Sequence, residues 1–451
     1  MRTAEIVVVG AGYAGLSAAR ATQRAGVETL VLEAQSRVGG RAHTDRSVFP
    51  PVDLGGQWIG PGQDRILSLA REYDAATYST HTKGRDVLAE PHRVHRVGKW
   101  IPPMILMQAL TLLPALAFVR SLARRVNPRN PWAMHDAATW DSVTVAAFLE
   151  RRVPSARARR WVETLLRSEF CVELDSMSML TLATEFARSG GFASVIGEGS
   201  AQQDLFVDGA DRLPSLMAAE LEVRLNQAVL RISRTDRGLR VETADHEYEA
   251  RRVIMATPPH LVRQIAFEPE LPQSLNTHLE QLHMGRVIKM WAIYDTPFWR
   301  RSNDSGTVLM PDGPATVVTD ASQPGGPGQL CILACAANAD DLARVTPAER
   351  RRTVLASLER IFGTEASRPV AWREKVWTDD PWALGGYSAV PAPGTSDAHS
   401  TSAWKPWQGI HWAGTEVAEE WSGYFEGAIR SGEAAARQVI ASIGESSNNS
   451  R

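Results

Sequence analysis

Short apolar runs and amphipathic stretches alternate along the N-terminal part of the chain. Residues 5–9 form a run rich in β-branched side chains, which is typical of a strand buried on both faces. After a glycine-rich turn, residues 13–25 carry small side chains at helical spacing, such as Ala14 and Ala18, which would let a helix lie close to a sheet. Residues 27–32 form a second apolar run. The pattern predicts a strand, a turn, a helix and a second buried strand.

The middle of the chain follows a different pattern, because residues 78–202 are mainly of helical periodicity with Arg-rich stretches. Further along, strand-like runs are expected at residues 222–232, 239–242, 253–256, 287–294, 307–310 and 409–413, and helices at residues 347–362 and 424–442. This alternation predicts an α/β protein in which one discontinuous domain is interrupted twice by a second domain.

The predicted division assigns three segments to the first domain and two to the second. The first domain takes residues 1–78, 207–281 and 380–443, and the second takes residues 79–206 and 282–379. The polar residues 444–451 are expected to form a disordered tail.

Composition and charge narrow the class of function. The 451 residues carry 49 basic and 51 acidic side chains, and this balance argues against a nucleic-acid partner. Only five of the basic residues are lysines, so each lysine is worth locating. Three cysteines, Cys171, Cys331 and Cys335, are too few for a disulfide framework or a four-cysteine zinc site. The histidines show no metal-ligand spacing, so we expect no metal. The few cysteines fit reduced thiols, so we expect a cytoplasmic setting.

One stretch resembles a membrane segment without meeting its length. Residues 104–119 are sixteen residues long and include Gln108, Thr111 and Pro114, whereas a spanning helix needs about 20 apolar residues. We expect a helix in a buried or surface-apolar setting and no membrane anchor, with contact to a membrane surface as the alternative.

A dinucleotide fingerprint stands at the predicted turn. Gly10, Gly12 and Gly15, with Tyr13 and Ala14 between them, make the G-x-G-x-x-G pattern directly after a strand and at the start of a helix. The first glycine makes the turn, the second lets a pyrophosphate reach the backbone, and the third lets helix and strand approach closely.

An acidic residue ends the second predicted strand. Glu33 is placed there to accept the ribose hydroxyls of a dinucleotide, and its charge disfavours a 2′-phosphate. The fingerprint and Glu33 by themselves do not separate NAD from FAD.

The motifs that follow separate them. Arg37-Val38-Gly39-Gly40-Arg41 comes next, then Asp53-Leu54-Gly55-Gly56-Gln57-Trp58, and near the end stand Trp412-Ala413-Gly414-Thr415-Glu416 and Trp421-Ser422-Gly423-Tyr424-Phe425-Glu426-Gly427-Ala428. In this order, over nearly the whole chain, they resemble the flavin-containing monoamine oxidase family. The resemblance implies a Rossmann-like FAD-binding domain interleaved with a mixed α+β substrate-binding domain.

The resemblance also implies a set of cofactor-binding residues. Arg41 would neutralise pyrophosphate charge, and Val229 would meet the adenine through its backbone. The other expected FAD-binding residues, beyond the fingerprint and Glu33, are Ala34, Arg37, Gly40, Gly56, Gln57, Trp58, Trp377, Gly414, Glu416, Tyr424 and Phe425. Because Gly386 stands where the mitochondrial members have a flavin-linked Cys, we expect non-covalent FAD.

Three residues are expected to act at the reacting centre. By resemblance, Lys289 would hold a water against flavin N5 and aid reoxidation, and Tyr387 and Tyr424 would flank the amine at the flavin face. Gln202, Phe170 and Cys171 are expected to line the substrate cavity.

The implied reaction is oxidation of a small-molecule amine. A hydride passes from the amine to flavin N5 and leaves an imine, which water hydrolyses to an aldehyde or ketone plus ammonia or amine, while O₂ is reduced to H₂O₂. Three alternatives stay open: a related flavoprotein oxidase or desaturase, an L-amino-acid oxidase, which needs a cation for the substrate carboxylate, and a non-catalytic flavin-binding protein. The sequence also leaves a homodimer open.

Overall fold

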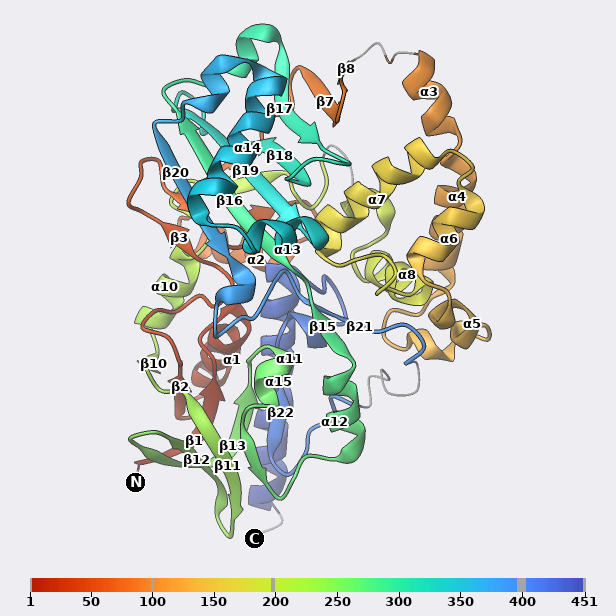
Figure 1. The fold of residues 1–451 in the computed structure, drawn as a ribbon. Coiled ribbons are helices and arrows are strands. Elements are labelled where there is room, and N and C mark those ends of the chain that lie inside the picture. Colours follow the sequence, from red (N-terminus) through yellow and green to blue (C-terminus); the bar gives the residue numbers. More distant parts are fainter. Residues whose placement is uncertain (1, 99–100, 102, 196–198, 396–402, 449–451) are drawn as a thin grey trace.

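The computed structural model describes residues 2–98, 101, 103–195, 199–395 and 403–448. Its strands gather into two large sheets, one containing the N-terminal strand and the other lying above it in Figure 1. A group of helices stands beside the upper sheet, and the described ends of the chain both lie at the far end of the lower sheet (Figure 1). The functional site lies where the lower sheet, the upper sheet and the helices meet.

The lower sheet has eight strands built around parallel β1. It runs in the order β10-β2-β1-β13-β12-β11-β14, and β22 pairs with β13. The strands are β1 (Arg2–Val9), β2 (Thr29–Leu32), β10 (Glu222–Arg224), β11 (Val229–Thr235), β12 (Gly238–Thr243), β13 (Glu247–Met255), β14 (Ala266–Glu268) and β22 (Ile410–Trp412). The apolar run of β1 is buried because β2 and β13 flank it in parallel and helices cover it.

Two helices pack closely on this sheet. They are α1 (Tyr13–Arg24) and the long C-terminal α15 (Phe425–Asn448). A Cβ at Gly432 of α15 would lie 2.1 Å from the carbonyl oxygen of Ala14, so the two helices approach to backbone contact. The small side chains predicted along residues 13–25 serve this contact. Helices α2 (Asp64–Glu72) and α10 (Arg212–Ala219) complete the same hydrophobic core.

The upper sheet has seven strands and holds the second core. Its order is β20-β16-β19-β18-β17-β7-β8. The strands are β7 (Arg85–Glu90), β8 (Arg93–Val97), β16 (Val287–Tyr294), β17 (Asp304–Leu309), β18 (Val317–Asp320), β19 (Gly328–Cys335) and β20 (Ala371–Val376). Every residue of β16 and β19 is buried. Helices α13 (Ala337–Ala343) and α14 (Pro347–Phe362) belong to the same part of the chain, and a Thr346–Glu349 capping box starts α14.

The helical group comes from the middle of the chain and has its own core, except that Ile105 of α3 (Pro103–Leu110) packs in a separate cluster with Leu88 and Trp161. The members of the group are α3, α4 (Leu113–Arg125), α5 (Ala137–Ser142), α6 (Val145–Arg152), α7 (Ala156–Phe170), α8 (Met179–Arg188) and α9 (Phe192–Val195). The expectation of a mainly helical segment missed β7 and β8, which pair with each other and extend the upper sheet. The strand expected at residues 222–232 is two strands, β10 and β11, in different places in the lower sheet.

Each large sheet takes its strands from the segments predicted for one domain, and two small sheets pair strands from both sets of segments. All strands of the lower sheet come from residues 1–78, 207–281 and 380–443, and all strands of the upper sheet from residues 79–206 and 282–379. Strand β9 (Asp204–Phe206) pairs with β5 (Trp58–Ile59) and β6 (Thr77–Ser79), and β15 (Leu282–Met284) pairs with β21 (Ala389–Pro391). The domain division itself stays a prediction.

The expected disordered tail is wrong for its first residues. Helix α15 continues to Asn448, so residues 444–448 are helical, and residues 449–451 lie outside the described residues. The physical reason is that residues 444–448 contain no proline, and Gly444 alone weakens a helix without ending it.

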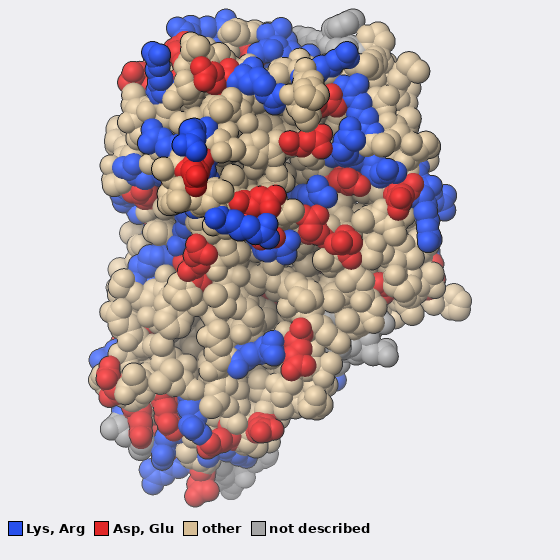
Figure 2. Space-filling view, viewed as in Figure 1, with Lys and Arg blue, Asp and Glu red and all other residues tan. Residues whose placement is uncertain are grey.

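The apolar stretch at residues 104–119 forms parts of two helices. Within the described residues, no single helix has the length and apolar composition to cross a membrane, whereas α3 and α4, which meet at a bend of 42°, satisfy both criteria only as a pair. On the face shown in Figure 2, basic and acidic side chains are intermixed, as expected from their near balance in the sequence.

Candidate active site

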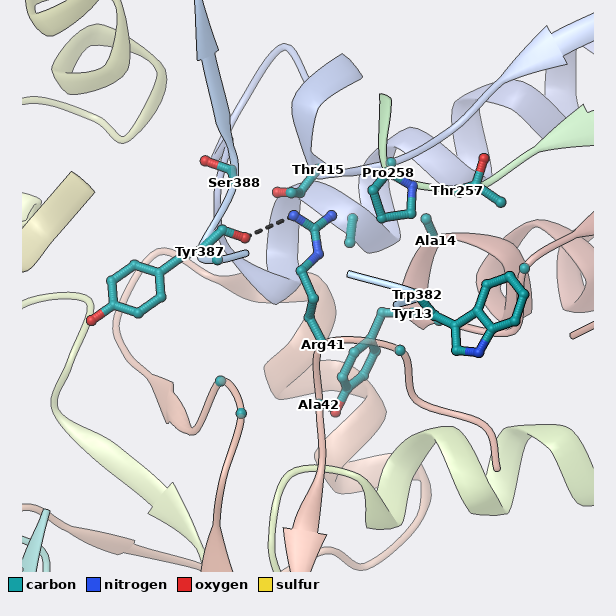
Figure 3. A pocket seen from close by; sticks show the side chains of 18 of the residues that line it. Tyr13, Ala14, Arg41, Ala42, Thr257, Pro258, Trp382, Tyr387, Ser388 and Thr415 are labelled. Atoms are coloured by element: carbon teal, nitrogen blue, oxygen red, sulfur yellow. Dashed lines mark hydrogen bonds between the residues drawn. The ribbon is translucent and has the colours of Figure 1, made fainter. Parts of the chain in front are cut away.

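The glycine loop between β1 and α1 opens the site. Gly10 has φ +105°, and a Cβ there would lie 2.8 Å from the carbonyl oxygen of Ala256. A Cβ at Gly15 would lie 1.9 Å from the carbonyl oxygen of Gly10, so α1 touches the loop directly. No side chain caps the start of α1, and Figure 3 shows Tyr13 and Ala14 at the cavity wall. The first turn therefore presents backbone N–H groups to an anion.

Glu33 fixes this loop from the end of β2. Its carboxylate accepts hydrogen bonds from the backbone N–H groups of Ala11 (2.7 Å) and Gln35 (2.9 Å), and the side chain is buried. Burial raises the pKa of Glu33, against these hydrogen bonds and the charge of Arg37. A carboxylate has further acceptor positions, so Glu33 can also receive ribose hydroxyls.

Arg41 spans the middle of the cavity. Its Nη1 donates to the carbonyl oxygen of Tyr387 (2.7 Å) and to Oε1 of Glu416 (2.6 Å), and its Nη2 donates to Oε2 of Glu416 (3.1 Å). Figure 3 shows the guanidinium beside Thr415 and Pro258, close to the start of α1. Burial alone would raise the pKa of Glu416, but the charge and hydrogen bonds of Arg41 lower it. Glu416 thus holds the Arg41 guanidinium in place.

These parts line one cavity of about 360 Å³. The sequence-predicted residues that line it are Gly10, Gly12, Tyr13, Ala14, Glu33, Ala34, Gly40, Arg41, Gly56, Gln57, Trp58, Phe170, Gln202, Val229, Lys289, Trp377, Tyr387, Gly414, Tyr424 and Phe425. They come from both large sheets and from α7, so the structure brings together residues that lie far apart in the sequence.

Three predicted cofactor-binding residues act from outside the cavity lining. Gly15 provides the close helix contact, and Glu416 orients Arg41. Arg37 donates to the carbonyl oxygens of Gly40 and Ala42 (2.8 and 3.0 Å), so it shapes the loop after β2.

The role predicted for Cys171 stays a prediction, because Cys171 lies next to the lining residue Tyr387 but outside the described lining of the cavity. Cys171 is the left-handed C-cap residue of α7 (φ 57°), and it is fully buried with its Sγ 3.6 Å from Sγ of Cys335. The turn after α7 brings this thiol against β19 of the upper sheet and next to Tyr387 of the cavity wall.

Lys289 reaches the cavity from β16. Its side chain is 4% exposed, and its ammonium donates to the carbonyl oxygen of Gly55 (2.7 Å) and to Oε1 of Gln57. The rings of Trp58 and Trp291 lie 5.5 and 5.4 Å from Nζ. Burial lowers the pKa of Lys289, while Cys331 and Asp53 act in the opposite direction. A lysine on a buried strand is costly without such partners, and here they aim it at the cavity.

Tyr387 and Tyr424 are both held by the end of α7. The Tyr387 hydroxyl donates to the carbonyl oxygen of Ser168 (3.2 Å), and the Tyr424 hydroxyl donates to Oε1 of Glu169 (2.6 Å). Gln202 Nε2 donates to the other carboxylate oxygen of Glu169 (3.1 Å). Glu169 was missed by the sequence analysis, although it directly precedes Phe170. It lines the cavity, and no periodicity marks it.

The lining fits a flavin dinucleotide. Gln57 Nε2, Trp58 Nε1 and Thr257 Oγ1 are buried polar atoms at the cavity wall without a hydrogen-bond partner in the described part of the chain. Buried donors of this kind are normally satisfied. Together with the bare start of α1, Glu33 and Arg41, they provide polar contacts at several points along one elongated ligand.

Comparison with known proteins decides the family. A family model described as flavin containing amine oxidoreductase matches residues 13–440. The chain belongs to this family. It is therefore a flavin-dependent amine oxidase, and FAD is its cofactor.

Individual relatives match over nearly the full chain. A protein of Mycobacterium tuberculosis named as a putative flavin-containing monoamine oxidase, AofH, is 36% identical over 443 residues, with 97% of each chain covered. Human flavin-containing amine oxidase B is 32% identical over 461 residues, covering 98% of this chain and 87% of the relative. A structure of wild-type putrescine oxidase bound to putrescine superposes with a TM-score of 0.92 at 29% identity, covering 97% and 99% of the two chains. The predicted family, fold class and enzyme class are confirmed.

Proposed function

We propose that this amine oxidase oxidises its substrate between the rings of Tyr387 and Tyr424, with dioxygen as the electron acceptor. The observation that carries the proposal is that both phenols are anchored to α7 at the wall of the same cavity that Lys289 and the glycine loop line. Aromatic walls attract an amine nitrogen through the ring faces and exclude water.

FAD would be held along the cavity by the chain's own groups. The first turn of α1 and Arg41 would face the pyrophosphate, Glu33 the ribose, and Val229 the adenine. When bound, FAD accepts two electrons and a proton from the amine's α-carbon position and passes them on to dioxygen. Lys289 would hold a water beside the redox-active ring, with Gly55 and Gln57 fixing its ammonium.

The tyrosines would orient the substrate as its neutral amine. An ammonium has no lone pair to assist C–H cleavage, so turnover should rise with pH through the apparent pKa of the bound amine. The product is an imine, which water hydrolyses after release. Hydrogen peroxide is the accompanying product of the oxidase reaction.

The cavity favours an amine over an amino acid. Among the described residues that line it, the only Lys or Arg side chains are Arg41 and Lys289. Arg41 is paired with Glu416, and Lys289 donates to Gly55 and Gln57. An amino-acid substrate would need an uncommitted cation for its carboxylate, so the amino-acid oxidase alternative is disfavoured.

We further propose that the enzyme works in the cytoplasm without a membrane anchor. All three cysteines are buried free thiols, and this cysteine usage is the one expected of a protein from a reducing compartment. The protein is expected in the supernatant after high-salt membrane washing, and partition with the membrane fraction would contradict this.

A peroxidase-coupled assay on the purified yellow holoenzyme tests the proposed reaction. A panel of primary, secondary and cyclic amines, diamines and L-amino acids should give peroxide with at least one amine class and none with the amino acids. FAD-free protein is the control. Anaerobic bleaching of the flavin by an amine without peroxide in air would overturn dioxygen as acceptor, and no bleaching by any amine would overturn the proposed reaction.

A further inference from the structure

We infer that Glu169 forms a subsite for a second positive charge on the substrate, so that the enzyme prefers diamines to simple alkylamines. This inference rests on the proposed amine oxidation and names the substrate class of the same cavity. Nothing in the sequence motifs pointed to Glu169.

The contacts of Glu169 leave it able to bind a further donor. One carboxylate oxygen accepts from the Tyr424 hydroxyl (2.6 Å) and the other from Gln202 Nε2 (3.1 Å). A carboxylate offers about four acceptor positions, so two donors leave room for an ammonium group. These two donors also fix the orientation of the carboxylate at the cavity wall.

The charge of Glu169 is not neutralised by the protein. Among the described residues, no Lys or Arg forms an ion pair with it. The neighbouring acidic residue of the cavity, Glu185, is paired with Arg188 (3.1 Å). Taking a carboxylate out of water without a cation is costly. Burial raises the pKa of Glu169, against its hydrogen bonds to Tyr424 and Gln202. A substrate ammonium would supply the missing cation.

The helix that carries Glu169 adds to its negative field. Glu169 is the last residue but one of α7, a 15-residue helix. The C-terminal end of a helix carries a partial negative charge on its free carbonyl groups. The Ser168 carbonyl is among these groups, and it receives the Tyr387 hydroxyl. The helix end and the Glu169 carboxylate therefore both favour a cation at this end of the cavity.

The position of Glu169 separates it from the reacting end of the substrate. Both tyrosines turn their hydroxyl ends to residues 168 and 169 of α7. At their other end the two tyrosines are attached to the backbone next to Gly386 and Gly423. There the Tyr387 carbonyl oxygen accepts a hydrogen bond from Arg41, one of the expected FAD-binding residues. An extended diamine can therefore place one nitrogen between the rings and the other at the carboxylate.

The test is a comparison of matched substrates in the wild-type and Glu169→Gln holoenzymes. 1,4-Diaminobutane and n-pentylamine have the same length and differ by an ammonium in place of a methyl group. We expect wild-type kcat/KM to be at least tenfold higher for the diamine. In Glu169→Gln, the diamine value should fall at least tenfold, mainly through KM, and the pentylamine value should change less than threefold.

Glu163→Gln is the control variant, because Glu163 is on the same helix, lies near Arg159 (3.9 Å) and is not part of the cavity lining. It should leave both substrates unchanged. An equal loss for both substrates in Glu169→Gln would overturn the inference, since Glu169 would then only position Tyr424. A wild-type enzyme that oxidises both substrates equally well would overturn it too. A wild-type holoenzyme that oxidises no amine would instead refute the proposed function.

A second variant covers the case in which Glu169→Gln loses FAD or fails to fold. Glu169→Asp keeps the charge and withdraws it by one methylene. Across α,ω-diamines of three to six carbons, the preferred length should then shift to a longer diamine. An unchanged length preference would contradict the subsite.

Discussion

At the residue scale, the environment of Lys289 constrains which side chain can stand there. Lys289 is buried on an inner strand, its Nζ lies within 5.5 Å of the ring centroids of Trp58 and Trp291, and its ammonium is fixed by Gly55 and Gln57. An arginine could not make the same contacts, because its planar fork needs more room and more acceptors than a compact ammonium. A fixed cation beside the flavin would stabilise the negative charge that develops as dioxygen is reduced.

Replacing Lys289 by Met should therefore separate the two halves of the reaction. Met has similar length, fills the buried space and removes the charge. Reoxidation of the reduced enzyme by dioxygen is expected to slow at least tenfold, which is about 1.4 kcal/mol, while reduction of the flavin by amine changes less than threefold. Stopped-flow measurement of each half-reaction checks this.

Lys375→Met is the matched control. Lys375 faces Lys289 across the β16–β20 ladder, but its ammonium pairs with Asp380 (2.7 Å) and does not line the cavity. Both half-reactions should stay within about threefold of wild type. Equal slowing of reduction and reoxidation in Lys289→Met would remove the assigned role of Lys289.

A single site residue could be predicted from the sequence where its neighbours along the chain mark its position. Gly10, Gly15 and Glu33 could be predicted because a strand, a turn and a helix fix their geometry within a short segment. Lys289 was marked by a charge inside an apolar run. Glu169 had no such marker, because its role arises from Tyr424, 255 residues away.

At the element scale, α1 makes a close contact with the loop after β1. The absence of a Cβ at Gly15 lets the helix start against the Gly10 carbonyl. The first turn of α1 then lies at the cavity wall without a side-chain cap. The position of α1 thus determines whether the backbone N–H groups of its first turn can donate to a phosphate in the cavity.

Gly15→Ala should push α1 off the loop. We expect it to destabilise the protein by about 2 kcal/mol or more and to lower the FAD content. Thermal unfolding and the flavin-to-protein absorbance ratio are the measurements. Gly444→Ala in α15 is the control, because a Cβ at that position would have no other atom within 4 Å. It should be neutral or slightly stabilising, since alanine is the better helix former. Equal behaviour of the two variants would refute the close contact.

Elements with strong internal patterns were the ones that could be predicted. The expected strand at residues 287–294 and helix at residues 347–362 coincide with β16 and α14. β7 and β8 were missed, because charged side chains interrupt their apolar positions, and they become strands only through the pairing of β7 with β17 and of β8 with β7. The register and order of both sheets depend on contacts between distant segments, which no local pattern encodes.

At the scale of the whole molecule, the cavity joins parts of the chain that have separate cores. Its lining takes residues from the glycine loop, from β16 of the upper sheet, from α7 and from the segment before α15. A ligand that contacts all of them stabilises the assembled state, because the unfolded chain offers no such site. FAD should therefore act as a structural link as well as the redox group.

Because FAD is bound non-covalently, it can be removed and added back, and its contribution to stability can be measured. Gly386 offers no side chain for attachment, and the three cysteines are buried and absent from the described cavity lining. Acid precipitation should leave all the flavin in the supernatant, and a yellow pellet would contradict the prediction. Protein stripped of FAD should unfold at a lower temperature and regain stability with added FAD, by about 2.7 kcal/mol at a free concentration of 100 times Kd. An unfolding temperature that did not rise with added FAD would contradict selective binding of FAD to the folded chain, and with it the proposed link.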